Sequence, residues 1–205
     1  MNILLFGGTG SLGRHLLGQL LAAGHKVAVF ARTPAKITLT HPNVSVLQGD
    51  LLDERDVFDA LEGRDAVINA VGGAFDSTVR SEGLRNILLA MNRHGVRRIL
   101  SVGGPGILDA GDGMVYERPS FPPMLVPVTE EHRRGYEQLL ASGTDWTLVC
   151  PPMMKEGPAT SKYRVQADVP LSGGWEMPLA DVAAFMVREL RQGKFIGKRV
   201  AIASA

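Results

Sequence analysis

Three glycines near the N-terminus, Gly7, Gly10 and Gly13, have a spacing that suits the binding of an anion. They follow an apolar run over residues 3–6, which predicts a buried strand, and they precede leucines with helical spacing. Glycine lets the chain bend tightly and lets a ligand approach the backbone. The free N–H groups and the dipole at the start of the helix favour an anion there. The ligand that we expect is the pyrophosphate of a dinucleotide.

The glycine pattern reads Gly-x-x-Gly-x-x-Gly and differs from the Gly-x-Gly-x-x-Gly pattern of many dinucleotide sites. An ordinary glycine-rich turn between a strand and a helix is the alternative interpretation. The order of strand, glycines and a helix of about four turns favours the dinucleotide. We expect Thr9, Ser11 and Leu12 to share the contact with the glycines.

Arg32 is a candidate for recognising the 2′-phosphate of NADPH. It directly follows a predicted strand over residues 26–31, at the place where NAD-binding units carry an acidic residue for the ribose hydroxyl. A carboxylate would repel the phosphate, whereas a guanidinium pairs with it through two parallel hydrogen bonds. The alternative is a solvated arginine at the end of a strand.

Two further strand ends carry candidate binding residues. Asp50 follows a predicted strand over residues 44–47 and can accept a hydrogen bond from an adenine amino group, although it can equally be a turn aspartate. Asp53 is expected to cap a helix that begins at Glu54. The strand predicted over residues 65–70 ends in Val71 and Gly72, where the backbone can again touch a ligand.

The elements that must hold these residues alternate between strands and helices. This alternation predicts a single-domain α/β Rossmann fold over residues 1–205, with a doubly wound parallel sheet covered by helices on both faces. Ligands bind such sheets at the carboxyl ends of the strands, so these loops share one rim. The remaining expected elements are helices over 78–94, 129–142 (with Thr129 as N-cap) and 178–191, and strands over 96–102, 146–150 and 199–202.

Two segments depart from the alternation. Residues 103–128 are rich in glycine and proline, and an irregular stretch of this length predicts a lid-like loop, with a disordered surface excursion as the alternative. Residues 155–177 are predicted to form a small β excursion on the same rim.

Composition indicates an ordinary globular protein. The net charge of +1 gives no basic surface for nucleic acid or an anionic membrane. The single cysteine, Cys150, fits a reducing cytoplasm, and no apolar run has the length of a membrane span. No basic residue precedes the first apolar run, so we expect no signal peptide and a cytoplasmic location.

Several of these stretches resemble the atypical short-chain dehydrogenase/reductases. They are the glycine motif over residues 7–13, Gly49-Asp50, residues 65–68 and Pro151-Pro152. Within that family the chain is most similar to the biliverdin-IXβ reductases, also called NADPH-dependent flavin reductases. Residues 78–87, 128–133 and 139–143 carry this narrower resemblance, and the likeness runs over nearly the whole chain.

The resemblance implies that NADPH lies along the rim and passes hydride to a flavin (FMN, FAD or riboflavin) or to a linear tetrapyrrole such as biliverdin. It places the glycine loop on the pyrophosphate, Arg32 and Thr33 on the 2′-phosphate, and Asp50 and Leu51 near the adenine. It also implies that Gly72 and Arg80 lie near the cofactor. The nicotinamide and the acceptor would lie near the remaining residues, namely Gly103, Gly104, Pro151, Pro152, Met153 and Met154.

The chain departs from the family at two positions. The family has a serine where this chain reads Gly103-Gly104, and a histidine where it has Met153. His132 matches the family and is the retained candidate for a catalytic proton donor. These differences bear on recognition of a bilin more than on binding of the cofactor.

Proton transfer sets a limit on the chemistry. The larger superfamily uses Tyr-x-x-x-Lys, whereas the three tyrosines here are followed four residues later by Ser120, Leu140 and Ala167. Oxidation of a simple alcohol needs a positioned base. Flavin reduction asks mainly for proximity and stacking, because N1 can take its proton from water. Met153, Met154 and Trp175 could form an apolar floor for a flat ring, or could equally be core or interface residues.

His132 is predicted in the first turn of a helix, where the positive end of the dipole disfavours the imidazolium. Three hypotheses follow: an NADPH-dependent flavin reductase, a non-catalytic NADPH sensor, or an isomerase or lyase on the same fold. We expect a small-molecule acceptor, no metal, no nucleic acid or membrane partner, and a monomer or weak dimer.

Overall fold

A computed structural model describes residues 1–73 and 77–205, and its centre is an eight-stranded sheet in the order β3-β2-β1-β4-β5-β6-β10-β8. All neighbouring strands are parallel except β8, which runs antiparallel to β10. The strands are β1 (Asn2–Phe6), β2 (Lys26–Ala31), β3 (Val44–Gln48), β4 (Ala66–Asn69), β5 (Arg98–Val102), β6 (Asp145–Cys150), β8 (Tyr163–Ala167) and β10 (Lys198–Ser204).

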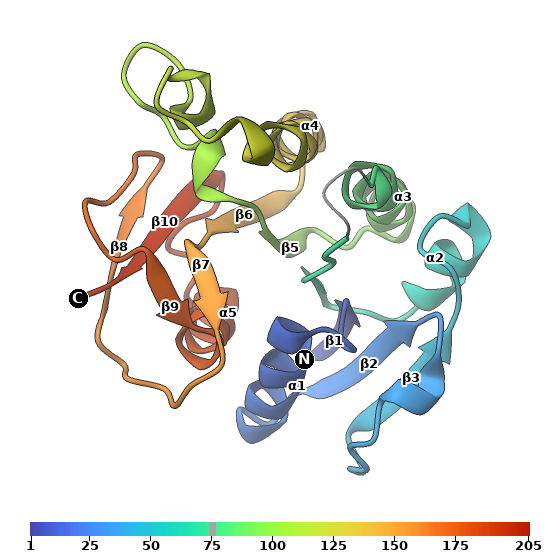
Figure 1. Cartoon of the computed structure of the whole chain (residues 1–205). Helices are drawn as coiled ribbons and strands as arrows, with labels where there is room; N and C mark the ends of the chain where they lie inside the picture. Colours follow the sequence, from blue (N-terminus) through green and yellow to red (C-terminus); the bar gives the residue numbers. More distant parts are fainter. Residues whose placement is uncertain (74–76) are drawn as a thin grey trace.

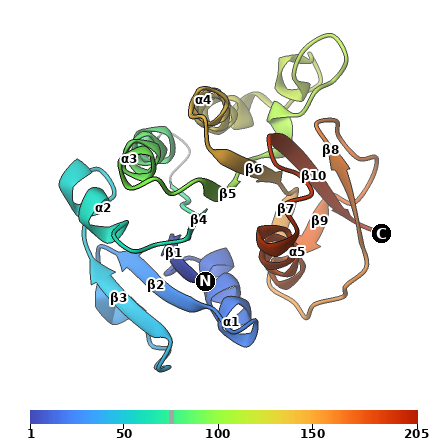
Figure 2. The ribbon, with the colours of Figure 1, turned by 180° about the vertical axis from the view of Figure 1, so that it is seen from behind.

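Helices cover both faces of this sheet, as Figures 1 and 2 show from opposite sides. One face carries α2, α3 and α4, and the other carries α1 and α5. Alternation along β1 supplies both cores, since Leu4 and Phe6 pack on the first face while Ile3 and Leu5 pack on the second. The helices are α1 (Ser11–Ala22), α2 (Glu54–Ala60), α3 (Val79–His94), α4 (Val126–Ala141) and α5 (Leu179–Gln192).

The order of the strands reverses at β1, which lies between β2 and β4. Phe6 at the end of β1 is in register with Phe30 of β2 and with Asn69 of β4. The loops after these strands therefore diverge to opposite faces of the sheet and leave a crevice at their carboxyl ends. The single-domain doubly wound α/β fold expected from the sequence is confirmed.

Local expectations are confirmed at several element ends. The side chain of Asp53 caps α2, and its Oδ1 accepts hydrogen bonds from the backbone N–H groups of Arg55 at 2.8 Å and Asp56 at 3.1 Å. Helix α3 ends at Gly95 with φ of 69°, a left-handed conformation that glycine adopts without strain.

The start of α4 corrects one prediction. The helix begins at Val126, three residues before Thr129, and Pro127 lies in its first turn, where its missing N–H costs nothing. Thr129 is therefore not the N-cap; it is buried inside the helix against Gly106, and a Cβ at Gly106 would lie 2.6 Å from its methyl group.

Residues 103–128 are more ordered than a long irregular loop. They contain the 3₁₀ turns η2 (Pro105–Ile107), η3 (Val115–Glu117) and η4 (Pro123–Leu125) before α4 begins. The first of these turns is tied to β10, since Arg199 donates to the carbonyl of Ile107. Just after the turn, Asp109 N donates to Asp168 O, which follows β8, at 2.8 Å. Whether the segment acts as a lid stays a prediction.

The expected β excursion over residues 155–177 is divided between two sheets. The strands β7 (Met153–Lys155) and β9 (Glu176–Pro178) form a small parallel sheet beyond the ends of the main strands. β8 instead extends the main sheet as its edge strand. No helix in the described part of the chain is long and apolar enough to cross a membrane.

Candidate cofactor and acceptor site

The glycine loop after β1 has the geometry of a binding cradle. Gly7 has φ of 80°, and a Cβ there would lie 2.4 Å from the carbonyl oxygen of Ala70. At Gly13 a Cβ would lie 2.1 Å from the Gly7 carbonyl oxygen, so this glycine permits α1 to pack on the loop. Gly10 N donates to Gly7 O at 3.0 Å and closes the turn.

The start of α1 offers backbone donors to a ligand. Gly10 is its N-cap and has no side chain to accept from the first turn. No acidic residue lies in that turn. An anion at this point would accept hydrogen bonds from the free backbone N–H groups of the first turn of α1, and it would lie at the positive end of the helix dipole.

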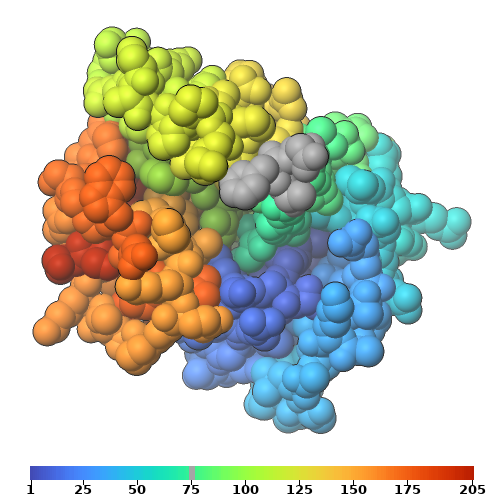
Figure 3. All heavy atoms as spheres, viewed as in Figure 1, coloured from blue at the N-terminus to red at the C-terminus, as the bar shows by residue number. Residues whose placement is uncertain are grey.

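Two adjoining cavities of about 520 and 440 Å³ lie on either side of this loop. Gly10, Ala70, Val71 and Gly72 line both, so the cavities form one groove along the carboxyl ends of the strands. In Figure 3 the segments that border the groove meet on the face toward the viewer: the glycine loop in blue, the loop after β4 in green and the loop after β6 in orange.

The first cavity combines charged side chains with an apolar wall. Arg32 and Asp50 line it together with Leu51, while Phe6 and Phe30 contribute to its apolar wall. The Asp50 Oδ1 accepts from Leu52 N at 3.0 Å, so Asp50 forms an aspartate turn and also faces the cavity. The sequence left open whether Asp50 is a turn aspartate or a ligand contact, and this geometry is compatible with both.

The second cavity has a wall of mixed character. It is lined by Ser11, Leu12, Arg80, Gly103, His132, Met154 and Glu156. Glu156 is held there by His15 of α1, whose Nε2 lies 3.0 Å from its Oε2. Apolar and titratable side chains thus meet within reach of the glycine loop.

His132 lies in the second turn of α4, with its ring against the strand-5 loop. A Cβ at Gly104 would lie 3.0 Å from His132 Cδ2, so the ring packs directly against the backbone of this loop. Burial, and after it the nearby Arg80 guanidinium, lower the pKa of His132 to about 4, against a smaller opposing effect of Glu131. The imidazole is neutral as expected, but the predicted reason, the dipole of the first helical turn, is wrong.

Arg80 projects from the first turn of α3 into the second cavity. Its Nη2 donates to the carbonyl oxygen of Gly73 at 2.7 Å, which ties the loop after β4 to the helix. Burial lowers the pKa of Arg80, although the guanidinium remains charged at neutral pH. A fixed cation therefore stands beside the glycine loop.

Several residues expected in the site do not line either cavity. Met153 in β7 and Trp175 directly before β9 are 69% and 85% exposed and line neither cavity, so the structure does not place the expected apolar floor in the groove. Met154, the next residue along β7, points to the opposite side and does line the groove. The others outside the cavity walls are Gly13, Thr33, Gly104, Pro151 and Pro152.

Sequence reasoning missed a buried polar layer beneath the groove. Asn69 Nδ2 donates to Ser101 Oγ at 3.1 Å across the ends of β4 and β5, and its Oδ1 accepts from Val71 N. Glu131 is also buried, beside His132. A polar residue at the end of a buried strand could have indicated Asn69, but no sequence signal separated Glu131 from its neighbour Glu130.

Fold and groove together define a nucleotide-binding protein of the Rossmann class. A family model described as NAD(P)H-binding matches residues 7–193, and the chain belongs to that family. The residues present fit a dinucleotide. The start of α1 has no side-chain cap, and the glycine loop before it is so tightly folded that a Cβ at Gly7 or Gly13 would collide with the backbone.

Individual relatives support this class. A provisionally named epimerase from Bacteroides thetaiotaomicron is 28% identical, with a TM-score of 0.88 over 99% of this chain and 96% of that one. A Streptococcus pneumoniae structure with a provisional NADH-flavin reductase name shares the fold at 23% identity, with a TM-score of 0.84 over 100% of both chains. A 3-beta-hydroxysteroid dehydrogenase from Mycolicibacterium neoaurum is 30% identical over 127 residues, which are 55% of this chain and 34% of that protein. The chain thus spans about a third of the length of the curated relatives that it matches first.

Proposed function

We propose that the protein is an NADPH-dependent reductase of flavins or similarly flat acceptors, including linear tetrapyrroles. One observation carries the proposal: a single groove runs from Arg32, past the glycine loop, to a pocket lined by His132 and Met154. Its two ends differ in the way that the two ends of NADPH differ, because one end offers a cation for the 2′-phosphate and the other offers the apolar side chains of Leu12 and Met154 with the neutral imidazole of His132.

Arg32 supports the choice of phosphorylated cofactor. It lines the first cavity at the end of β2, where its guanidinium can pair with a phosphate on the adenosine ribose. The N–H groups at the start of α1 would hold the pyrophosphate, and Arg80 would add a positive charge beside it.

The second cavity sets the chemistry that the protein can assist. NADPH supplies a hydride when bound. Met154 and Leu12 provide apolar surface against which a flat acceptor can lie, and they exclude water from that side. His132 is neutral, so it can donate one N–H hydrogen bond to the acceptor and orient it, while the acceptor takes its proton from water.

A panel of acceptors tests this function. NADPH oxidation is followed with FMN, FAD, riboflavin, quinones and biliverdin, each repeated with NADH. We expect flavin-dependent oxidation with a lower KM for NADPH than for NADH. Tight NADPH binding without turnover of any acceptor would overturn the reductase and favour a nucleotide sensor.

A further inference from the structure

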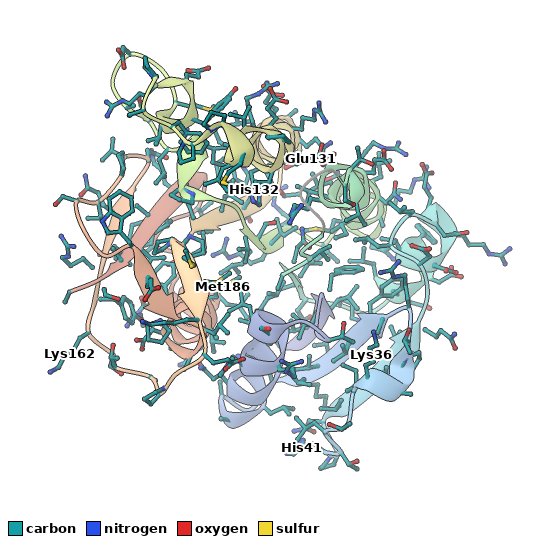
Figure 4. The ribbon with its side chains drawn as sticks, viewed as in Figure 1. Lys36, His41, Glu131, His132, Lys162 and Met186 are labelled. Carbon is teal, nitrogen blue, oxygen red and sulfur yellow. The ribbon has the colours of Figure 1, made fainter. Side chains whose placement is uncertain are left out.

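Glu131 is a buried carboxylate that joins two helices beneath the groove. It lies on α4 directly before His132 and is 4% exposed. Its Oε2 accepts from Ser81 Oγ at 2.8 Å and from Ser81 N at 3.3 Å, both on α3. Its Oε1 accepts from Arg134 Nη1 at 2.5 Å. Figure 4 labels Glu131 and His132 next to each other at α4, with Glu131 toward α3.

The contact with Ser81 does the work of a helix cap. Ser81 is the third residue of α3, and the side chain of Thr78, the N-cap residue, makes no capping hydrogen bond. An N-cap normally supplies an oxygen to the N–H of the second or third residue. Here a carboxylate from another helix supplies it, and the negative charge also suits the dipole at the start of α3.

This cap stands between Arg80 and His132, which both line the second cavity. Arg80 precedes Ser81 on α3, and His132 follows Glu131 on α4. Arg80, Glu131 and His132 all line a small void of about 20 Å³ below the groove. Burial raises the pKa of Glu131, but the hydrogen bonds from Ser81 and Arg134 outweigh it and leave the pKa lowered, so the carboxylate is charged at neutral pH.

We propose that Glu131 is a positioning residue, which fixes Arg80 against the cofactor and His132 against the acceptor by tying the first turn of α3 to α4. The half that concerns His132 rests on the proposed function. The half that concerns Arg80 requires only that the groove bind NADPH. A single carboxylate thereby couples the cofactor part of the site to the acceptor part.

Three variants separate this role from a merely structural one. Glu131→Ala removes the cap, while Glu131→Gln keeps an oxygen that can accept from Ser81 but loses the charge. Glu137→Ala is the matched control, because Glu137 is a carboxylate on the same helix that pairs with Arg133 on the surface. NADPH affinity is measured by fluorescence and FMN turnover by steady-state kinetics, both well below the melting temperature of each variant. Folding is measured by thermal denaturation.

We expect Glu131→Ala to weaken NADPH binding and to lower kcat with FMN, each by roughly 10-fold and by no more than about 100-fold, since small misplacements cost rates of this size. Glu131→Gln should return NADPH affinity to within about threefold of wild type, because a neutral hydrogen bond keeps part of the strength of a charged one. Glu137→Ala should leave both quantities unchanged.

A Glu131→Ala protein with a lower melting temperature but wild-type NADPH affinity and kcat would overturn the proposal. The same holds if Glu131→Gln fails to recover affinity, or if Glu137→Ala reproduces the losses. Should Glu131→Ala not fold, Ser81→Ala carries the test, since it removes the stronger contact and keeps the backbone one; unchanged NADPH affinity there contradicts the proposal. Absence of flavin reduction by the wild type would count against the proposed function, whereas the NADPH affinities of the variants would still decide the role of Glu131.

Discussion

Arg32 is the residue on which the choice between NADPH and NADH depends. A charge-assisted hydrogen bond contributes about 1.5–3 kcal/mol, so Arg32→Ala should weaken NADPH binding roughly 10- to 100-fold. NADH lacks the 2′-phosphate and should change little. Titration of both cofactors by fluorescence checks this, and equal losses for both would show that Arg32 does not read the phosphate.

His132 is a buried, neutral imidazole, and we do not expect it to act as a general acid. General acid catalysis is typically worth about 10²–10⁴-fold. We expect His132→Ala to lower FMN turnover by less than about 10-fold, below that range, because the flavin can be protonated from water. Turnover measured across neutral pH is the test. A loss above about a thousandfold with intact NADPH affinity would make His132 a true acid.

Residue-level reasoning found the parts of the site that have local signatures. Gly7, Gly10 and Arg32 could be predicted because their type and their place at the end of a strand carry the argument. Trp175 and Met153 could not be placed, because their exposure depends on how β7 and β9 pair beyond the main sheet. Glu131 escaped prediction because only the packing of α3 on α4 brings it to Ser81.

At the scale of the elements, the glycine loop makes separate demands at each glycine. A Cβ at Gly10 would come no closer to protein than 3.3 Å, from the Gly7 carbonyl oxygen, whereas at Gly13 it would lie 2.1 Å from that atom. We expect Gly10→Val to abolish NADPH binding while the fold survives, because the branched side chain takes the space of the pyrophosphate. Gly13→Ala should instead destabilise the protein.

The control for this pair is Gly18→Ala in the middle of α1, where a new Cβ meets nothing within 4 Å. It should bind NADPH as wild type does and should be slightly more stable, since alanine favours a helix by about 1 kcal/mol over glycine. NADPH titration and thermal denaturation measure all three variants. Unchanged affinity in Gly10→Val would remove the assignment of the anion site.

Element boundaries were predictable where a cap marks them and not elsewhere. Asp53 indicates the start of α2 in the sequence, and its side chain caps the helix in the structure. Thr129 carries the same kind of signal, yet α4 starts earlier because Pro127 suits a first turn and Thr129 packs against Gly106. A capping residue that tertiary packing buries inside a helix cannot be recognised from sequence alone.

For the whole molecule, the lowered pKa of His132 makes stability depend on pH. The unfolded chain binds a proton near pH 6.5, whereas the folded protein resists it down to about pH 4. Stability should therefore fall as pH falls from about 6.5 toward 4, by on the order of 1–3 kcal/mol, since each pKa unit is worth about 1.4 kcal/mol. Buried His25, whose pKa is also lowered, contributes in the same direction.

Urea denaturation between pH 7 and pH 4.5 measures this slope. This pH range lies mostly above the range in which Glu131 and Asp181 matter. Their pKa values lie below the ordinary 4.5 and 3.8, so the stability that these carboxylates contribute is lost mainly at lower pH. His132→Gln should flatten the slope and leave only the part due to His25. An unchanged slope in that variant would mean that His132 is not held neutral by burial.

The overall fold was the most predictable level of this protein. Short apolar strands that alternate with amphipathic helices allow few arrangements other than a parallel sheet covered on both faces. The edge was less predictable, because β8 joins the sheet antiparallel beside β10 after a long excursion that has no periodicity of its own. Long-range pairing of this kind leaves little trace in local sequence.

In the proposed function, the groove holds NADPH so that its hydride passes to a flat acceptor. The most direct measurement mixes the wild-type protein with NADPH and FMN in the absence of oxygen at neutral pH, and follows the absorbance of both compounds. We expect NADPH to disappear and reduced FMN to form in equal amounts, with one proton taken from solvent for each hydride. Bound NADPH that leaves FMN, riboflavin and biliverdin oxidised would contradict it.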